Sequence, residues 1–101
     1  MTIDSRHTDV LRELQSLITD WADQVIPHRT LHDASVKLLE EVAEAFANPG
    51  DPGELADMAI LVMDMFHLAG VDMEQAIRDK MAVNKQRSWQ RDPRTRILKH
   101  V

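Results

Sequence analysis

The sequence predicts an all-α protein, an antiparallel bundle of about four helices. Apolar residues recur at helical spacing in four successive segments, and no segment carries a good strand pattern. The connections between these segments are short and contain Pro, Gly or Asp, so successive helices are expected to lie antiparallel. The length of 101 residues is near the most common size of a single domain.

The first two helices are predicted from apolar spacing and from a capping signal. The first is expected from about Thr8 to Val25 and is ended by the segment IPHRT. The second is expected to begin after Thr30, a preferred N-cap residue, with Asp33 in the place of the Glu of a capping box. It continues to about Ala47. The apolar stripe of the first helix consists of Val10, Leu11, Leu14, Leu17, Ile18, Trp21 and Val25.

The third helix is expected from about Gly53 to Ala69, after the tight reversal NPGDPG, with Gly70 as its stop. Its apolar residues point in nearly every direction around the axis, so this helix is expected to be central and covered on most sides. One chain of this length can hardly cover it completely. We therefore expect a homo-oligomer, either a homodimer or a homotetramer.

The fourth helix is expected to start at the cap residue Asp72 and to continue to roughly Trp89. We place a single helical domain at residues 1–89. Residues 90–101 are interpreted as a basic C-terminal tail that is broken at Pro93.

Charge is divided unevenly along the chain. Residues 1–77 hold 15 acidic and 4 basic residues, whereas residues 78–101 hold 2 acidic and 8 basic residues. An acidic body is not the basic surface of a duplex-binding protein, so no nucleic acid polymer is expected as a partner. The division suits metal ions on carboxylates and an anion held by Lys and Arg. The alternative is a basic tail that merely packs on an acidic body.

The composition also bears on the expected location. There is no cysteine, so neither a disulfide framework nor a thiolate metal site is expected. The longest apolar run, MAILVM, is far shorter than the roughly 20 residues that cross a bilayer. The N-terminal residues show no secretory signal. We expect a cytoplasmic protein with no membrane partner.

Four carboxylates are placed symmetrically about the reversal between the second and third helices. Glu41 and Glu44 are three residues apart on the second helix, so they share one face. Glu54 and Asp57 have the same spacing on the third helix. Residues equidistant from the turn of an antiparallel hairpin lie at the same height. Glu41 is therefore expected to face Asp57, and Glu44 to face Glu54, unless the acids form a solvated face.

Carboxylates gathered without a cation would repel one another and lose hydration, so protons or metal ions must neutralise them. An all-oxygen set suits Mg²⁺, with Mn²⁺ as the alternative ion. Glu40 lies to one side, as a candidate for a second metal ion or for orienting water. Asp64 is interpreted as either a support for this site or a paired core carboxylate.

A polar stripe is expected on the fourth helix. Lys80, Asn84 and Arg87 occur at i, i+4 and i+7, in line with the apolar Met73 and Ile77. A seam that changes from apolar to cationic suggests a bound anion, because Lys supplies a point charge and Arg a planar fork for phosphate oxygens. The alternative is that these residues leave the bundle and pair with acids.

Together these patterns resemble the all-α nucleoside triphosphate pyrophosphohydrolases, the superfamily of MazG and the dimeric dUTPases. The shared pattern is EExxE, then ExxD, then a K…N…R segment. Here it covers about residues 30–89 and ends in NKQRSW. The chain is most similar to the short-loop dATP/dGTP diphosphohydrolase-like branch. The short connection between the two acidic motifs departs from typical MazG proteins, so their substrate specificity is not carried over.

The resemblance implies hydrolysis of a (d)NTP to (d)NMP and pyrophosphate, with Mg²⁺ as cofactor. It implies that Glu40 and Glu41 act in catalysis. The implied metal ligands are Glu41, Glu44, Glu54 and Asp57. The implied contacts to the triphosphate and sugar are Lys80, Asn84 and Arg87.

Base recognition and two other functions stay open. Trp21 and His28 are candidates for contact with the base, as is His32, although Trp at this spacing is more often a core residue and loop histidines are usually solvated. One alternative function is a phosphoribosyl-ATP pyrophosphohydrolase-like enzyme. The other is a non-catalytic helical interaction module.

Overall fold

The computed structural model describes residues 5–101 and confirms the predicted all-α helical bundle. No helix in this described range is both long and apolar enough to cross a membrane. The elements are α1 (Ser5–Val25), α2 (Leu31–Ala47), α3 (Pro52–Ala69), α4 (Met73–Gln86), β1 (Trp89–Arg91) and β2 (Leu98–His100).

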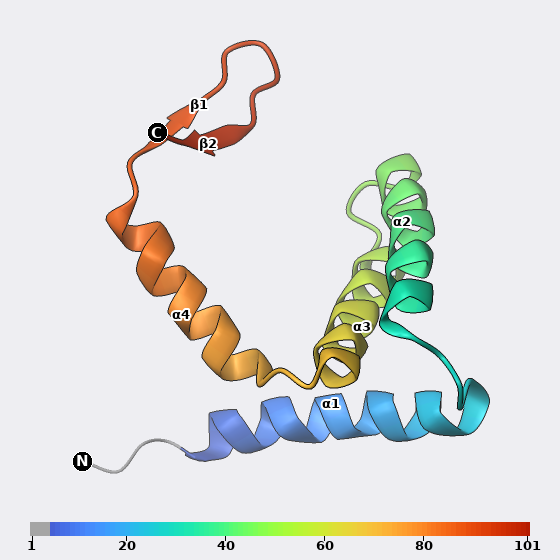
Figure 1. The fold of residues 1–101 in the computed structure, drawn as a ribbon. Helices are drawn as coiled ribbons and strands as arrows, with labels where there is room; N and C mark the ends of the chain where they lie inside the picture. The colour runs from blue at the N-terminus through green and yellow to red at the C-terminus, as the bar shows by residue number, and fades with distance from the viewer. Residues whose placement is uncertain (1–4) are drawn as a thin grey trace.

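The helices form an open arrangement (Figure 1). α1 lies along one side, and the antiparallel pair α2–α3 stands on it. α4 rises away from this pair and ends in the hairpin of β1 and β2. α3 contacts each of the other three helices, so its predicted central position is confirmed.

Local signals account for the helix ends. The Thr30 hydroxyl accepts from the backbone N–H of Asp33 at 3.1 Å, and the Asp33 carboxylate accepts from the N–H of Thr30 at 3.0 Å, which confirms the capping box. Asp72 caps α4 by accepting from the N–H of Gln75 at 2.9 Å. Gly70 ends α3 with φ of 68°, a left-handed conformation that glycine adopts without steric cost.

The β hairpin was not expected from the sequence. β1 and β2 pair antiparallel, with Trp89 opposite His100, and α4 ends at Gln86 instead of near Trp89. The Asp92 carboxylate holds the connecting turn by accepting from two backbone N–H groups and by pairing with Lys99 at 2.9 Å. Three-residue strands are too short to show a period-two pattern, so the sequence does not reveal them. The division into a domain and a tail stays a prediction.

The chain is expanded for its size. Its radius of gyration is 16.2 Å, compared with about 13 Å for a compact domain of this length. Its accessible surface is 8156 Å², compared with about 5,800 Å² for a compact monomer of the same mass. α3 is central but not covered on most sides within one chain, because Leu55, Ile60 and Val62 stay exposed. α4 and the hairpin extend away from the α2–α3 pair and therefore do not cover α3 (Figure 1).

Candidate metal centre and adjacent pocket

Three of the four predicted ligand residues converge between α2 and α3. Glu41, Glu44 and Glu54 each place one carboxylate oxygen within 4.8 Å of the other two. The i, i+3 spacing sets Glu41 and Glu44 on one face of α2, and the antiparallel reversal brings the start of α3 against that face. Asp57 is not a member of this cluster, and its side chain is exposed. Its role as a fourth ligand stays a prediction.

The cluster fits a hard divalent cation. Glu41 is buried, with 6% of its surface exposed. One oxygen of Glu41 and one of Glu54 (Oε2 in each) are buried without a hydrogen-bond partner among the described residues. Buried carboxylate oxygens that lack a partner are costly, and a metal ion with oxygen ligands would satisfy them. These residues therefore have the chemistry that a Mg²⁺ or Mn²⁺ site requires.

Lys37 is a site residue that the sequence reasoning missed. Its Nζ atom lies 3.2 Å from Glu40 and 3.3 Å from Glu41. The hydrogen bond to Glu40 raises the pKa of Lys37 most, and the hydrogen bond to Glu41 raises it further, so the side chain stays charged. The sequence did contain a signal for these pairs, because Lys37 precedes Glu40 by three residues and Glu41 by four on one helix. Glu40 is 60% exposed and therefore open to water, as a proton acceptor needs.

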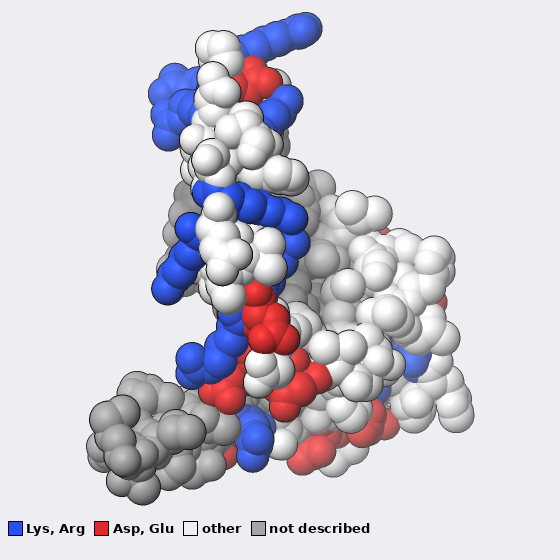
Figure 2. All heavy atoms as spheres, turned by 60° about the vertical axis from the view of Figure 1, so that its left-hand side comes forward, with Lys and Arg blue, Asp and Glu red and all other residues white. Residues whose placement is uncertain are grey.

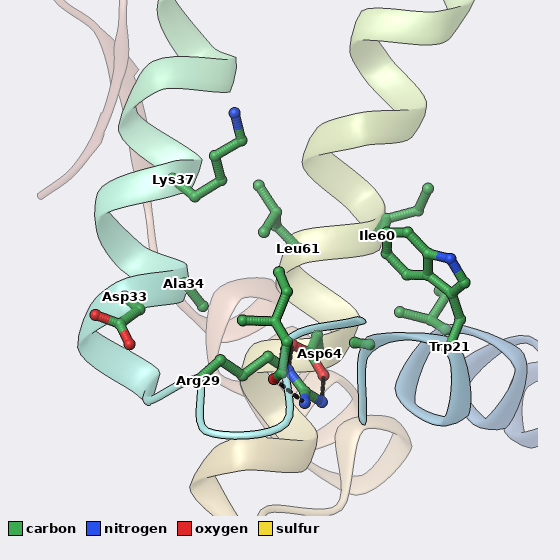
Figure 3. Close-up of a pocket in the computed structure, with 11 residues that line it drawn as sticks. Trp21, Arg29, Asp33, Ala34, Lys37, Ile60, Leu61 and Asp64 are labelled. Carbon is green, nitrogen blue, oxygen red and sulfur yellow. Dashed lines mark hydrogen bonds and ion pairs between the residues drawn. The ribbon is translucent and has the colours of Figure 1, made fainter. Parts of the chain in front are cut away.

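An apolar cavity of about 120 Å³ lies between α1, α2 and α3 (Figure 3). Lys37 connects this cavity to the acidic cluster, because it both lines the cavity and pairs with Glu41. Trp21 forms one wall and is 57% exposed, so it is not a fully buried core residue. The other lining residues are Ile18, Ala22, Ile26, Arg29, Asp33, Ala34, Ile60, Leu61 and Asp64.

A buried ion pair closes one end of the cavity (Figure 3). Arg29 donates two hydrogen bonds of 2.6 Å to the two carboxylate oxygens of Asp64, and each side chain is 6% exposed. Arg29 also donates to Asp23 at 2.8 Å. The hydrogen bonds to Asp64 raise the pKa of Arg29. Asp64 is therefore a paired core carboxylate. The pair escaped the sequence analysis because no local signal joins residues 35 positions apart.

The cationic stripe makes no contact with the acidic cluster among the described hydrogen bonds and ion pairs. Lys80 is exposed, whereas Asn84 and Arg87 are half-buried. Among the described residues, no hydrogen bond or ion pair joins these three side chains to the acidic cluster. The side-chain oxygen of Asn84 is buried and has no hydrogen-bond partner in the same range.

The two candidate histidines lie in exposed positions. His28 belongs to the α1–α2 connection and is not one of the residues that line the cavity between these helices. His32 lies exposed in the first turn of α2. Their contact with a base stays a prediction.

Comparison with known proteins decides the family. The family model of the dATP/dGTP pyrophosphohydrolases matches residues 14–101, which include the acidic cluster, the cavity and the hairpin. The chain belongs to the dATP/dGTP pyrophosphohydrolase family. Within this family, it is 46% identical over 85 residues to a dATP/dGTP diphosphohydrolase of Salmonella phage PMBT28. That match covers 83% of this chain but only 29% of the phage protein.

A second relative of the dATP/dGTP pyrophosphohydrolase family comes from cyanophage S-2L. Its dATP/dGTP diphosphohydrolase is 44% identical over 81 residues, a match that covers 78% of this chain and 77% of the relative. The solved structure of the cyanophage S-2L MazG-like pyrophosphohydrolase superposes with a TM-score of 0.83 at 41% identity. The match covers 90% of this chain and 96% of the cyanophage chain. The cyanophage structure holds dGDP and three catalytic Mn²⁺ ions per active site.

Proposed function

We propose that this chain hydrolyses a purine deoxynucleoside triphosphate to the monophosphate and pyrophosphate. The observation that carries the proposal is the convergence of Glu41, Glu44 and Glu54, with two buried oxygens that lack partners in the described part of the chain. Membership of the dATP/dGTP pyrophosphohydrolase family supports the reaction, and the names of both phage relatives support the purine preference.

We propose Mg²⁺ or Mn²⁺ as the cofactor, held by Glu41, Glu44 and Glu54. Asp57 is retained as a further ligand, because it shares one face of α3 with Glu54 at i, i+3 spacing and its side chain is exposed. The bound ion would offset the charge of the triphosphate and lower the pKa of the attacking water. The Mn²⁺ ions of the cyanophage neighbour support this choice.

In the proposed reaction the water oxygen attacks the α-phosphorus. The bond from that phosphorus to the bridging oxygen breaks, and pyrophosphate leaves with the electron pair. Glu40, exposed and hydrogen-bonded to Lys37, accepts the proton of the water. Lys37 lowers the electrostatic cost of gathering negative charge beside Glu41, because it stays charged there. Catalysis then rests on positioning and electrostatics.

The rest of the nucleotide is assigned to two surfaces. We propose that the base enters the cavity against Trp21, since an aromatic face stacks on a base and Lys37 of the cavity wall pairs with Glu41 of the acidic cluster. Lys80, Asn84 and Arg87 contact the triphosphate and sugar. His28 is retained as a base contact that would need movement of the exposed α1–α2 connection.

We also propose that the chain is a homo-oligomer, a dimer or a tetramer. The support is its accessible surface, which exceeds that of a compact monomer by about 2,300 Å². That excess per chain is on the scale of permanent homodimer interfaces, which bury about 2,000–5,000 Å² over both partners.

The test is a substrate panel with Mg²⁺ and release of pyrophosphate as the readout. The panel contains the four dNTPs, the four NTPs and phosphoribosyl-ATP. We expect turnover of dATP and dGTP and a loss of at least about 100-fold with Glu41→Gln and Glu54→Gln. Glu13→Gln, which removes an exposed carboxylate on α1, is the matched control and should retain activity. A folded protein that turns over no member of the panel would refute the proposal.

A further inference from the structure

Lys37 is the only Lys or Arg on the two helices that carry the acidic cluster. The sequences of α2 and α3 hold no other residue of either type, although both helices hold several acidic residues. Most of the cations of the chain lie elsewhere, since residues 78–101 contain 8 of the 12 Lys and Arg residues. Figure 2 shows Lys and Arg side chains spread along the column of α4 and the hairpin. Lys37 is therefore the counter-charge that α2 and α3 themselves supply to the acidic cluster.

The ammonium of Lys37 lies between two neighbouring carboxylates. Its Nζ atom is 3.2 Å from Oε2 of Glu40 and 3.3 Å from Oε1 of Glu41. Both acids are within reach of one long side chain, because they follow Lys37 by three and four residues on the same helix. Adjacent carboxylates repel each other, and a cation between them offsets that repulsion. Lys37 thus ties Glu40 to Glu41.

The two carboxylate oxygens of Glu41 have different surroundings. Oε1 faces Lys37, whereas Oε2 is buried and has no hydrogen-bond partner among the described residues. The side chain of Glu41 is only 8% exposed, so the packing around it restricts its movement. Lys37 therefore occupies one oxygen of Glu41 and leaves the other to the metal ion of the proposed site.

Glu40 depends on Lys37 in a different way. Its side chain is 60% exposed, and in the described part of the chain Lys37 is its only hydrogen-bond or ion-pair partner. An exposed side chain that lacks such a partner samples several rotamers in water. Packing thus holds Glu41 in place, whereas Lys37 holds Glu40.

We propose that Lys37 is a positioning residue with two opposite effects on the metal centre. It holds Glu40 beside Glu41 for the transfer of the proton from water, which raises the rate of the reaction. Its charge also weakens the binding of a divalent ion at Glu41, because two cations beside one carboxylate repel each other. The inference rests on the proposed function for the metal site and for the role of Glu40.

The effect on metal affinity is measured without nucleotide, by calorimetric titration with Mn²⁺. Lys37→Met removes the ammonium from a side chain that is 53% exposed, and Met is as good a helix former as Lys. We expect Mn²⁺ to bind Lys37→Met about 5- to 10-fold more tightly than the wild type. Lys37→Gln, a second uncharged variant, should show the same gain. Unchanged or weaker binding of Mn²⁺ to both variants would overturn the inference.

Two control variants separate a local charge from other effects. Lys37→Arg keeps the charge and can donate to both carboxylates, so its Mn²⁺ affinity should stay within about two-fold of the wild type. Arg78→Met removes the same charge from another i, i+4 pair, in which Arg78 lies 3.5 Å from Glu74 on α4. It should also stay within about two-fold, because salt screens distant exposed charges. A gain for Arg78→Met equal to that for Lys37→Met would overturn the local effect.

The effect on the rate is measured as kcat for dATP at saturating Mg²⁺. We expect kcat to fall by at least about 10-fold in Lys37→Met, and Lys37→Arg to restore most of it. In a Glu40→Gln background, Lys37→Met should cause no further fall in kcat, because Lys37 acts on the rate through Glu40. The gain in Mn²⁺ affinity should persist in that background, since it depends on Glu41. Losses of kcat that multiply in the double variant would overturn the positioning role.

The two measurements also distinguish the inference from the proposed function. A residue that only supports the fold would lower both metal affinity and kcat when it is replaced, whereas the inference requires changes of opposite sign. An active wild type with no change in either quantity for Lys37→Met would overturn the inference alone. A wild type that binds Mn²⁺ but turns over no dNTP would refute the proposed reaction, and with it the role of Lys37 in the rate.

Discussion

Removing one partner of the buried Arg29–Asp64 pair is expected to destabilise the protein strongly. Both side chains are 6% exposed and are joined by two hydrogen bonds of 2.6 Å. Loss of one member of a buried ion pair typically costs about 3–5 kcal/mol, because the remaining charge is left without compensation. The two possible removals are not equivalent here, since the partners differ in what they retain.

Asp64→Asn leaves Arg29 with its bond to Asp23 at 2.8 Å and with a neutral amide oxygen of the same shape. We therefore expect a cost near the lower limit, about 3 kcal/mol. Arg29→Met leaves the Asp64 carboxylate buried, and no other group in the described part of the chain donates to it. We expect a cost near the upper limit, about 5 kcal/mol. Arg29→Met is therefore expected to destabilise the protein more than Asp64→Asn, because Asp64 has no second partner among the described residues whereas Arg29 keeps Asp23.

The assay is urea unfolding followed by far-ultraviolet circular dichroism. Protein concentration is held constant, because assembly shifts the apparent stability. The double variant Arg29→Met/Asp64→Leu buries no charge and should lie within about 2 kcal/mol of the wild type. Asp23→Asn is the control: its side chain is 58% exposed, so the expected cost is below about 1 kcal/mol. Costs below about 1 kcal/mol for both single variants, or a double variant as unstable as their sum, would refute the reasoning.

Three further predictions concern the metal, the base and the cap of α2. Saturating Mg²⁺ at about 100 times its Kd should stabilise the wild type by about 2.7 kcal/mol in a thermal melt. Glu54→Gln should lose that gain, and equal melts with and without Mg²⁺ for the wild type would contradict the metal site. Trp21→Ala should lower kcat/KM for dATP by about 10- to 100-fold. An unchanged kcat/KM would exclude stacking on Trp21. The hydrogen bonds from Thr30 lower the pKa of Asp33 below its usual 3.8, so Asp33 stabilises the fold above that pH and ceases to do so as the pH falls through the lowered value. The stability difference between wild type and Asp33→Asn, measured by urea unfolding from pH 7 to pH 2, should therefore vanish at the acidic end. A difference that does not change with pH would contradict this account.

The sequence by itself determined the features whose physical cause lies within one or two helical turns. The capping box of Thr30 and Asp33 and the stop at Gly70 depend on neighbouring backbone groups, so their residues can be recognised in order along the chain. The convergence of Glu44 with Glu54 was predictable as well, because a short reversal between two helices fixes which residues share a height.

Only the tertiary structure decided which way each helix turns its faces and where α4 goes. Asp57 has the predicted spacing from Glu54 on α3, but its side chain is exposed and lies outside the cluster, and side-chain conformation is not fixed by spacing. The pairing of Arg29 with Asp64 joins residues 35 positions apart, and no local sequence pattern around either residue predicts it. Such choices depend on side-chain packing summed over the whole fold, which no local pattern contains.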